Sequence, residues 1–309
     1  MSTGALPTIV SLVPRRFEDG GWGGVPRFDY ELRSAIDGLV SLNSGRLHRL
    51  KLAWVAKKDP AAIVVCGNEM SLVVPDSLRT VVMHHGCAQT HWDRDPDWRD
   101  AGAKKFCDDQ GEMYRRPNRW FVAAAKWTAK QFSGHYDVPE APVLPNWVAP
   151  MPRLRPNNER PVILGDWRTF NKGSGVIDAL RAARPDLEFR PLRCEHDERP
   201  AFYGVADAYL CLSLSEGGAY SVADAEATSL PLVTTDVGNV FEYTNSIVIP
   251  WQQRDDVATV SAALDRALAL ERPADSSFYA NYDLKTWTAG WRNLLQTVAD
   301  TPVGEKRQP

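Results

Sequence analysis

The sequence contains no long hydrophobic run. None of its apolar stretches approaches the ~20 residues that a helix needs to cross a bilayer, so we expect no membrane span. Residues Met1 to Val13 have no basic segment ahead of their short apolar stretch, so we expect no secretory signal. These absences predict a cytoplasmic protein.

Cysteine is also scarce. The five cysteines are scattered along the chain and odd in number, which argues against a disulfide framework. Cys66 and Cys211 lie inside apolar, strand-like runs. We therefore expect reduced, mainly structural thiols, as is usual in a cytosolic compartment.

Neither sign of charge is in excess, because 36 Lys and Arg face 39 Asp and Glu for a net charge of −3. Such a balance gives no global attraction to nucleic-acid phosphates, so we expect no nucleic-acid partner. Hydrophobic residues make up 44% and charged residues 24%, which is typical of a globular protein. A length of 309 residues suits two domains of ordinary size.

Apolar runs of strand length recur between helix-like stretches. Their continuous apolar character predicts strands that are buried on both faces, as in a parallel sheet. Helical faces run from Phe28 to Leu39 and from Val257 to Leu268. This alternation predicts a doubly wound α/β architecture. The expected strands are Pro7–Val13, Ala61–Cys66, Thr80–Met83, Trp120–Ala123, Pro161–Leu164, Leu187–Leu192, Ala208–Leu212, Pro231–Thr234 and Ile247–Ile249.

A cluster of prolines marks the boundary between the two expected domains. Six prolines fall between Pro142 and Pro161, and proline both resists regular structure and stiffens a linker. We therefore divide the chain near residue 150, into a first domain of residues 1–150 and a second that begins at residue 151.

The most informative segment is residues 207–239. A buried strand is expected to end at Ser213, followed by a tight turn at Glu216-Gly217-Gly218. A helix should then begin near Ser221, whose hydroxyl can cap it. A glycine-rich turn that leads into a helix N-terminus presents backbone N–H groups and a positive dipole end, which suits a diphosphate.

Two acids flank this turn. Glu216 lies at its mouth, and Asp224 follows eight residues later. Carboxylates do not favour a phosphate, but they suit hydroxyl groups on either side of it, such as those of a sugar and a ribose. An ordinary Rossmann turn with solvated acids is the alternative interpretation.

In this order, the strand, turn and acids resemble the Glu-x7-Glu signature of glycosyltransferase family 4, a retaining family with the GT-B fold. Glu216 matches the first glutamate, which in the family contacts the donor sugar. Asp224 stands at the second position, which in the family holds the ribose hydroxyls, so the chain carries a Glu-x7-Asp variant. The resemblance implies that the donor is bound by Gly217, Gly218, Ala219, Tyr220, Ser221 and Asp224.

Two segments of the first half also resemble the family. The loop from Asp19 to Arg27 is similar to its N-terminal Gly-Gly loop, which implies that Gly23 and Gly24 lie against the donor phosphates. Pro26 breaks the glycine pattern of dinucleotide-binding loops, which argues against a nicotinamide-dependent dehydrogenase. The strand at Val81–Gly86 ends in two histidines, as a strand of the family does, and His85 matches the family's histidine better than His84. The resemblance implies a catalytic role for His85 in the interdomain cleft, beside the donor sugar.

A third resemblance lies at Ile163–Gly173, which is similar to the Gly-Arg…Lys-Gly loop of the family. There the two cations neutralise the donor diphosphate, which implies catalytic roles for Lys172 and Arg168. These residues are four apart, one closer than usual, and Trp167 stands where the family has its arginine. Catalysis is then mainly electrostatic, by stabilisation of the leaving diphosphate.

No metal site is expected. The Asp-x-Asp stretch at Asp93–Asp97 is charged and broken by proline, so we predict a solvated loop. No standard zinc spacing is matched by His84, His85, Cys87 and His91. Two roles stay open for Trp92 and Trp98, which are stacking on an acceptor sugar and ordinary packing.

The resemblance implies two Rossmann-like domains that face a cleft. Residues 1–150 bind the acceptor, residues 151–285 bind the nucleotide sugar, and residues 286–309 form a helix that returns to the first domain and a polar tail. The implied function is retaining, metal-independent transfer of a sugar to a glycan or glycolipid, with a nucleotide diphosphate sugar as co-substrate and no cofactor. A cytoplasmic enzyme of this kind is expected to contact the inner face of the membrane peripherally. The alternative is a non-catalytic nucleotide-sugar-binding protein of the same fold.

Overall fold

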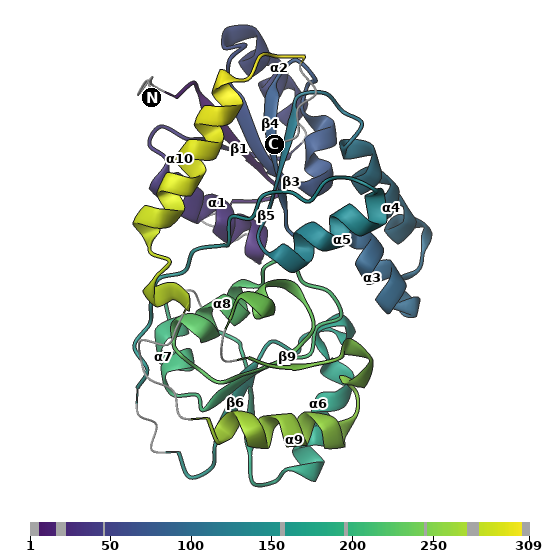
Figure 1. Cartoon of the computed structure of the whole chain (residues 1–309), viewed down its shortest axis with the longest axis vertical. Helices are drawn as coiled ribbons and strands as arrows, with labels where there is room; N and C mark the ends of the chain where they lie inside the picture. The colour runs from purple at the N-terminus through teal and green to yellow at the C-terminus, as the bar shows by residue number, and fades with distance from the viewer. Residues whose placement is uncertain are drawn as a thin grey trace. The chain divides into compact units, whose positions relative to one another are not determined.

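The computed structural model describes residues 6–16, 23–45, 47–154, 158–194, 197–243, 246–270 and 278–304. The chain divides into two compact units (Figure 1). Unit 1 comprises Met1–Asn146 and Leu284–Pro309, and unit 2 comprises Trp147–Asp283. Among the described residues, no helix combines the length and apolar character that a membrane crossing requires.

Unit 1 contains a five-stranded parallel sheet in the order β2-β1-β3-β4-β5. Strands β1, β3 and β5 are buried along their whole length, as continuous apolar runs predict. The strands are β1 (Ile9–Val13), β2 (Val40–Asn43), β3 (Ile63–Gly67), β4 (Arg79–His84) and β5 (Arg119–Ala123). The helices are α1 (Gly24–Ala35), α2 (His48–Lys58), η2 (Asn68–Val73), α3 (Ala88–Arg94), η3 (Pro96–Trp98), α4 (Ala101–Met113), α5 (Lys126–Tyr136) and α10 (Leu284–Asp300).

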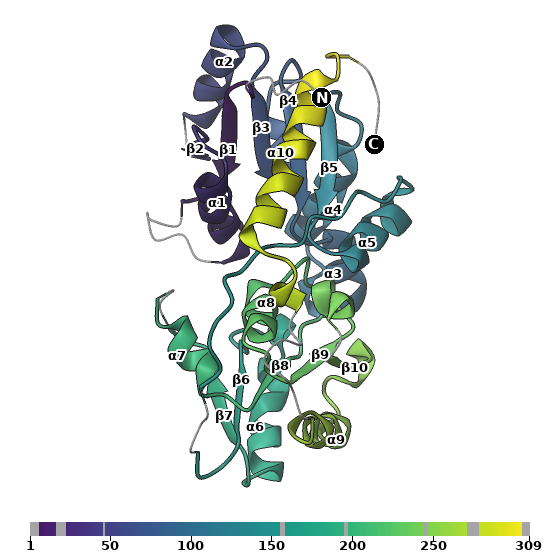
Figure 2. The ribbon, with the colours of Figure 1, turned by 60° about the vertical axis from the view of Figure 1, so that its left-hand side comes forward.

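Helix α10 completes unit 1 from the far end of the sequence. It packs on β3 and β4 beside α1 (Figure 2). Trp287, Trp291, Leu295 and Val298 are fully buried and recur at helical spacing, so they form one apolar face. The side chain of Arg292 adds a hydrogen bond and an ion pair to the end of the α1 segment. The first unit is therefore built from both ends of the described chain.

Unit 2 contains a second five-stranded parallel sheet, in the order β10-β9-β8-β6-β7. Its core joins Ile163, Leu210 and Val233 from the strands to apolar faces of α6 and α9. The strands are β6 (Val162–Gly165), β7 (Glu188–Pro191), β8 (Ala208–Cys211), β9 (Leu232–Thr235) and β10 (Ser246–Ile249). The helices are η4 (Phe170–Lys172), α6 (Ser174–Ala183), α7 (Arg199–Gly204), α8 (Tyr220–Ala227), η5 (Gly238–Glu242), η6 (Trp251–Gln253), α9 (Val257–Leu268) and η7 (Phe278–Ala280).

All nine predicted strands are present, and one strand was missed. Strand β2 lies at the sheet edge, and its residues are exposed or only partly buried, so it lacks a continuous apolar run. The first predicted helix is too long, because Ile36 is already extended and Gly38 has a φ of +76°. The chain therefore leaves the helix before Leu39 and turns into β2.

Parallel strands bring their carboxyl ends to one edge of each sheet. In unit 1, His85 follows β4 at that edge. In unit 2, Asp166 follows β6, and the segment that begins at Leu212 follows β8. The candidate functional side chains of each unit therefore lie at the carboxyl edge of its sheet.

Candidate active site

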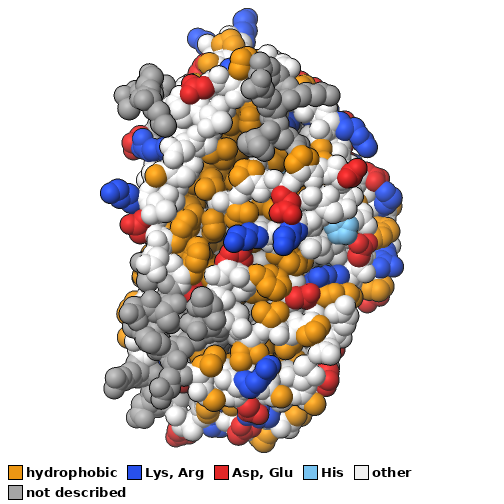
Figure 3. Space-filling model, viewed as in Figure 1, with side chains coloured by type: hydrophobic (Ala, Val, Ile, Leu, Met, Phe, Trp, Pro, Cys, Tyr) orange, Lys and Arg blue, Asp and Glu red, His pale blue; other side chains and the backbone are white. Residues whose placement is uncertain are grey.

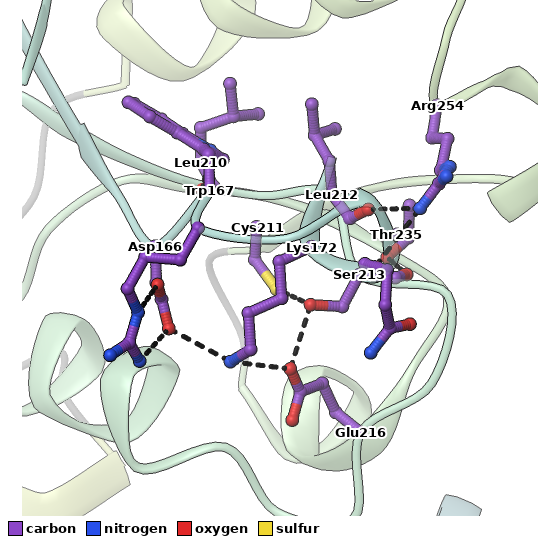
Figure 4. A network of polar contacts seen from close by, with 12 residues as sticks. Asp166, Trp167, Lys172, Leu210, Cys211, Leu212, Ser213, Glu216, Thr235 and Arg254 are labelled. Carbon is purple, nitrogen blue, oxygen red and sulfur yellow. Dashed lines mark hydrogen bonds and ion pairs between the residues drawn. The ribbon is translucent and has the colours of Figure 1, made fainter. Parts of the chain in front are cut away.

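Four charged side chains form a connected network at the carboxyl edge of the unit 2 sheet (Figure 4). Asp166 accepts hydrogen bonds from Arg168 at 2.7 and 3.0 Å and from Nζ of Lys172 at 3.0 Å. The same Nζ lies 3.3 Å from Oε1 of Glu216. The structure thus brings together three of the residues predicted from the sequence, Arg168, Lys172 and Glu216.

Glycine allows the loops of this network to pack closely. Gly173 has a φ of +88°, and a Cβ atom there would lie 2.6 Å from Cβ of Leu212. Gly238 has a φ of +59°, and a Cβ atom there would lie 3.3 Å from Glu216. A larger residue at Gly173 would be strained and would push η4, which ends in Lys172, away from β8.

Backbone contacts fix the same loops from the other side. The guanidinium of Arg254 is buried and donates to the carbonyl oxygens of Asn171, at 3.1 Å, and Leu212, at 3.2 Å. The backbone N–H of Leu214 donates to the Asn171 carbonyl at 2.9 Å. These bonds tie the segment before Lys172 to the segment before Glu216, so the distance between the two charges is set by the scaffold.

The Ser213 hydroxyl orients Glu216, and the Cys211 thiol supports Ser213. Ser213 Oγ donates to Oε1 of Glu216 at 2.8 Å, and the Cys211 thiol lies 3.6 Å from Ser213 Oγ. Burial raises the pKa of Cys211 to about 11, so its thiol stays protonated and can donate to Ser213. Cys211 is therefore a supporting group and not a nucleophile at neutral pH.

The network is electrically balanced. The Glu216 carboxylate raises the pKa of Lys172 against the opposing effect of burial. Burial would raise the pKa of Asp166, but its hydrogen bonds and ion pairs with Arg168 and Lys172 outweigh that effect and lower it. Asp166 and Lys172 are thus charged at neutral pH, and in the network two cationic side chains face two acidic ones. An incoming diphosphate would meet cations that already have carboxylate partners.

The turn after Glu216 leads directly into helix α8, as predicted. In the described structure of this turn, Ala219 is the N-cap and no side chain caps the helix, so the expected Ser221 cap is wrong. The helix begins at Tyr220, two residues earlier than a Ser221 cap would require. Ser221 instead lies in the first turn, and its carbonyl accepts from the Tyr203 hydroxyl at 3.0 Å. The positive end of the helix dipole lies at the Gly217-Gly218 turn.

Asp224 is paired within the protein. Its side chain is only 1% exposed, and Oδ2 accepts from Nη1 of Arg199 at 2.8 Å. Glu226, two residues later, accepts from the backbone N–H of Phe278 at 2.9 Å. Arg199 was not singled out in the sequence, because α7 carries no motif that would have indicated it.

Trp167, which stands where the family has its arginine, lies in the core of unit 2 and not in the charged network. Its side chain is 7% exposed and belongs to the core of unit 2, where Nε1 donates to the Leu210 carbonyl at 3.1 Å. Gly165 makes room for the indole, since a Cβ atom there would lie 2.4 Å from the ring. The residue that binds both cations is Asp166. The sequence signal for it was its place directly after a predicted buried strand.

In unit 1, His85 is half-buried at the end of β4. Its ring contacts Phe28 edge-on, with centroids 5.2 Å apart, and packs against Gly67, where a Cβ atom would lie 2.8 Å from Cδ2. Burial lowers the pKa of His85 to about 4, so the imidazole is neutral at physiological pH. Within the part of the chain that the structure describes, its buried Nε2 has no hydrogen-bond partner.

His84 serves the core of unit 1 instead. It is fully buried and stacks on Phe132 with centroids 3.8 Å apart. Nε2 of His84 is hydrogen-bonded to the Tyr114 hydroxyl at 2.8 Å, and Nδ1 lies 3.4 Å from Asn68. The two adjacent histidines therefore differ: both ring nitrogens of His84 have contacts within unit 1, whereas the buried Nε2 of His85 has no hydrogen-bond partner among the described residues.

The N-terminal glycine loop is described only in part, because residues 17–22 lie outside the described residues. Gly23 has a φ of +104°, a conformation that favours glycine, and it precedes helix α1, which begins at Gly24. This geometry accounts for a glycine at position 23 whether or not a ligand is bound.

The Asp93–Asp97 stretch is not the solvated loop that we predicted. Helix α3 runs to Arg94, and Asp95 is buried because it caps η3 and lies 3.1 Å from Nε2 of His91. Trp98 stacks on His91 with centroids 4.3 Å apart, so its ring is used in packing. Among the described residues, no group of three His, Cys, Asp or Glu side chains is arranged to hold a metal ion.

Neither the protein-family models nor the curated proteins give a match to this sequence. Solved structures do. HepE of Anabaena, in complex with UDP-glucose, is similar at a TM-score of 0.63 and 12% identity over 94% of this chain and all of that chain (100%). The sucrose-phosphate synthase of Thermosynechococcus elongatus is similar at a TM-score of 0.61 and 12% identity over 94% of each chain. The lipopolysaccharide outer core galactosyltransferase WaaB is similar at a TM-score of 0.58 and 11% identity over 94% of this chain and 99% of that chain.

The chain has the GT-B fold. The two parallel sheets and their helices agree with the fold predicted from the sequence. In GT-B terms, the Asp166–Glu216 network and helix α8 lie in the second Rossmann-like unit, and His85 lies in the first. At these identities the likeness establishes the fold, and the function has to be argued from the site.

Proposed function

We propose that this protein is a glycosyltransferase that takes a sugar from a nucleotide diphosphate donor. The observation that carries the proposal is the ion pair of Lys172 with Glu216, 3.3 Å apart, beside the turn that begins helix α8. These two residues come from separate loops, and the GT-B fold puts them at the carboxyl edge of one sheet. A cation, an acid and a helix N-terminus together match a diphosphate that carries a hydroxylated sugar.

In this proposal the donor exchanges partners within the network. The diphosphate takes Lys172 and Arg168 from Asp166 and contacts the N-terminal turn of α8, formed by Gly217, Gly218, Ala219, Tyr220 and Ser221. Glu216 then accepts hydrogen bonds from sugar hydroxyls, for which Ser213 already orients it.

The ribose and the reacting sugar need further groups. Asp224 would accept from the ribose hydroxyls while it keeps its ion pair with Arg199. Gly23, Gly24 and His85 in unit 1 are proposed to contact the donor, His85 through the Nε2 atom that is left without a partner. A neutral imidazole suits hydrogen bonding to an uncharged sugar.

Charge stabilisation supplies the proposed chemistry. Negative charge on the leaving diphosphate grows as the bond to the anomeric carbon breaks, and a fixed cation stabilises that state most. Lys172 fills this role because its neighbours hold it charged and in place. We propose that a metal ion is not required, that the anomeric configuration is retained, and that the acceptor is a glycan or glycolipid.

A nucleotide-sugar-binding protein without transfer activity is the second candidate. It is favoured by one observation, the carboxylate of Asp166, which is bound to both cations and would offset their stabilisation of the charge that grows on a leaving diphosphate. Slow hydrolysis of the donor in the absence of acceptor separates the two, because an enzyme releases nucleoside diphosphate and a binding protein does not.

The experiment is a thermal-shift panel of uridine, guanosine, adenosine and cytidine diphosphate sugars. A true donor at about 100 times its Kd adds about 2.7 kcal/mol to stability, which gives a clear rise in Tm. The Lys172→Ala variant is the matched control and should show a smaller rise. No shift with any donor, or an equal shift in the variant, would reject the proposed site.

Activity is then measured with the donor that the panel selects. We expect transfer to survive excess EDTA, and product NMR to show the anomeric configuration of the donor. Activity that is lost in EDTA and restored by Mn²⁺ would contradict the metal-independent mechanism.

A further inference from the structure

Helix α2 of unit 1 carries apolar side chains on two opposite sides. On one side, Leu52 is fully buried and Val55 is partly buried against the apolar cluster of β1 and β3. On the other side, Leu50 and Trp54 are 68% and 61% exposed, and Leu47, the residue that precedes the helix, is 60% exposed. Burial in the core accounts for the first side only.

The exposed residues form a continuous row. Leu47, Leu50 and Trp54 are spaced by three and four positions, which places them one above the other on a helix surface. We call these three residues the outer stripe. Single exposed apolar residues need no explanation, but a contiguous exposed row marks an interaction surface.

The charges around the outer stripe have one sign. Arg49, Lys51, Lys57 and Lys58 are all exposed, and the sequence from residue 47 to residue 58 contains no Asp or Glu. The whole chain is net negative, so this cluster runs against its overall balance. Blue and orange side chains lie together at the end of unit 1 where Figure 1 labels α2 (Figure 3).

These cations also lack carboxylate partners in the part of the chain that the structure describes. A comparison within unit 1 shows the difference, because Lys104 and Lys105 on α4 each form an ion pair with an acid four residues later. On α2, Nζ of Lys58 lies over the Trp54 ring, 5.5 Å from its centroid, and so contacts an aromatic ring and not an acid. The positive charge of α2 is thus available to an anionic partner.

We propose that the outer stripe and its flanking cations dock unit 1 on the surface of an anionic lipid bilayer. Leucine and tryptophan side chains enter the boundary between headgroups and acyl chains, and lysines bind the lipid phosphates. A lipid surface fits this face better than a protein partner does. Stable protein interfaces use about 20–30 residues on each side, whereas a bilayer needs no matching shape.

This surface is independent of the proposed donor site, since α2 contains none of the residues placed there. The test is co-sedimentation with vesicles of phosphatidylglycerol mixed with phosphatidylcholine, compared with pure phosphatidylcholine vesicles, at low and high salt. We expect the protein to bind the anionic vesicles and to lose binding as salt rises.

Two double variants separate the two components of the surface. Lys51→Glu with Lys58→Glu should weaken anionic-vesicle binding by at least about 25-fold, because each basic residue contributes about fivefold. Leu50→Gln with Trp54→Gln should weaken it by at least about tenfold, because burial of apolar area is lost. The matched control is Phe106→Gln on α4, which removes an apolar side chain that is 46% exposed and directly follows the two paired lysines. This variant should bind like the parent protein.

Circular dichroism and thermal unfolding establish that the variants are folded. Absence of binding to anionic vesicles, equal binding to both vesicle types, unaltered binding by either double variant, or an equal loss in the control would overturn the proposal. Concentration-dependent dimers in analytical ultracentrifugation that vanish with Leu50→Gln and Trp54→Gln would also overturn it, in favour of a second copy of the chain.

Discussion

Oδ2 of Asp166 lies 3.0 Å from Nζ of Lys172, so the cation that is proposed to face the leaving group already has a carboxylate partner. The same carboxylate binds Arg168 at 2.7 and 3.0 Å. A negatively charged donor must therefore displace Asp166 or share its cations. This relationship makes Asp166 the residue that sets how strongly the network attracts a diphosphate.

Asp166→Asn should tighten donor binding. The amide keeps the size of the side chain and removes the competing charge, so we expect a Kd lower by about tenfold, or about 1.4 kcal/mol. Isothermal titration with the donor that the panel selects measures this. The control is Asp178→Asn on α6, whose side chain is 90% exposed and pairs only with Arg181 among the interactions described. Weaker binding in Asp166→Asn would mean that its carboxylate serves the donor directly.

Lys172→Ala should lower kcat more than it weakens donor binding. Loss of one preorganised charge at the leaving group typically costs about 2.7–4 kcal/mol, which corresponds to roughly a hundred- to thousandfold in rate. Arg168→Ala should cost less, because that side chain is 57% exposed. Lys172→Arg should restore activity only in part, since a planar fork does not replace a compact charge.

The measurement for Lys172 is steady-state release of nucleoside diphosphate, analysed for kcat and KM separately. Arg181→Ala on α6 removes an exposed cation of the same unit and should leave both constants unchanged. If Lys172→Ala raised KM alone, the residue would only hold the donor, and the electrostatic account of catalysis would fail.

Arg199→Ala should destabilise unit 2. It leaves the buried carboxylate of Asp224 without its ion-pair partner, and breaking a buried pair costs about 3–5 kcal/mol. We expect about 3 kcal/mol, the low end of this range, because the Arg199 side chain is 21% exposed. Urea unfolding of the two single variants and of Arg199→Ala with Asp224→Ala forms a double-mutant cycle.

Asp224→Ala should therefore lower both stability and nucleotide affinity. We expect the affinity to fall by about 1.5–3 kcal/mol, the usual contribution of hydrogen bonds to a charged group. Titration at a temperature where the variant is fully folded separates the two effects. Unchanged nucleotide affinity there would leave Asp224 with a structural role only.

The two adjacent histidines predict a pH dependence of stability. Burial lowers the pKa of His84 to about 3 and that of His85 to about 4, from an ordinary value of 6.5. Between the lowered pKa of each histidine and the ordinary value of 6.5, the unfolded chain binds more protons than the folded chain, so stability rises with pH. The stabilisation is complete above pH 6.5 and is lost progressively as the pH falls towards 4.

NMR titration of the two imidazoles checks this directly. We expect both rings to stay neutral from pH 8 down to about pH 5, and the rate of transfer to show no ionisation of His85 near 6.5. An imidazole of His85 that titrates near 6.5 would show that it is not desolvated as the structure has it.

Much of the fold was readable from the sequence because parallel strands buried on both faces are continuous apolar runs. Strand β2 escaped because its edge position leaves it partly exposed. The Ser221 cap was wrong because position alone does not fix where a helix begins: α8 starts at Tyr220, so Ser221 falls inside its first turn.

The candidate site was predicted less completely. Lys172 and Glu216 follow from the motif, and the structure joins them. Asp166 was overlooked although it directly follows a predicted buried strand and its partners are close in the sequence. Arg199 depends on a contact with Asp224 in a different helix, which no local pattern encodes. The sequence marked Trp167 only as a departure from the family's arginine. Its place in the core depends on the absence of a side chain at Gly165 and on the hydrogen bond to the Leu210 carbonyl.

Helix α10 gives the chain an order of assembly. Residues 147–283 form unit 2 between the two parts of unit 1, so the ribosome completes unit 2 before it has made the helix that covers β3 and β4. Until then, the sheet surface that receives Trp287 and Trp291 stays open to water and to chaperones. The second unit made is thus the first that can close its core, and the nascent chain carries an unfinished first unit while unit 2 is synthesised.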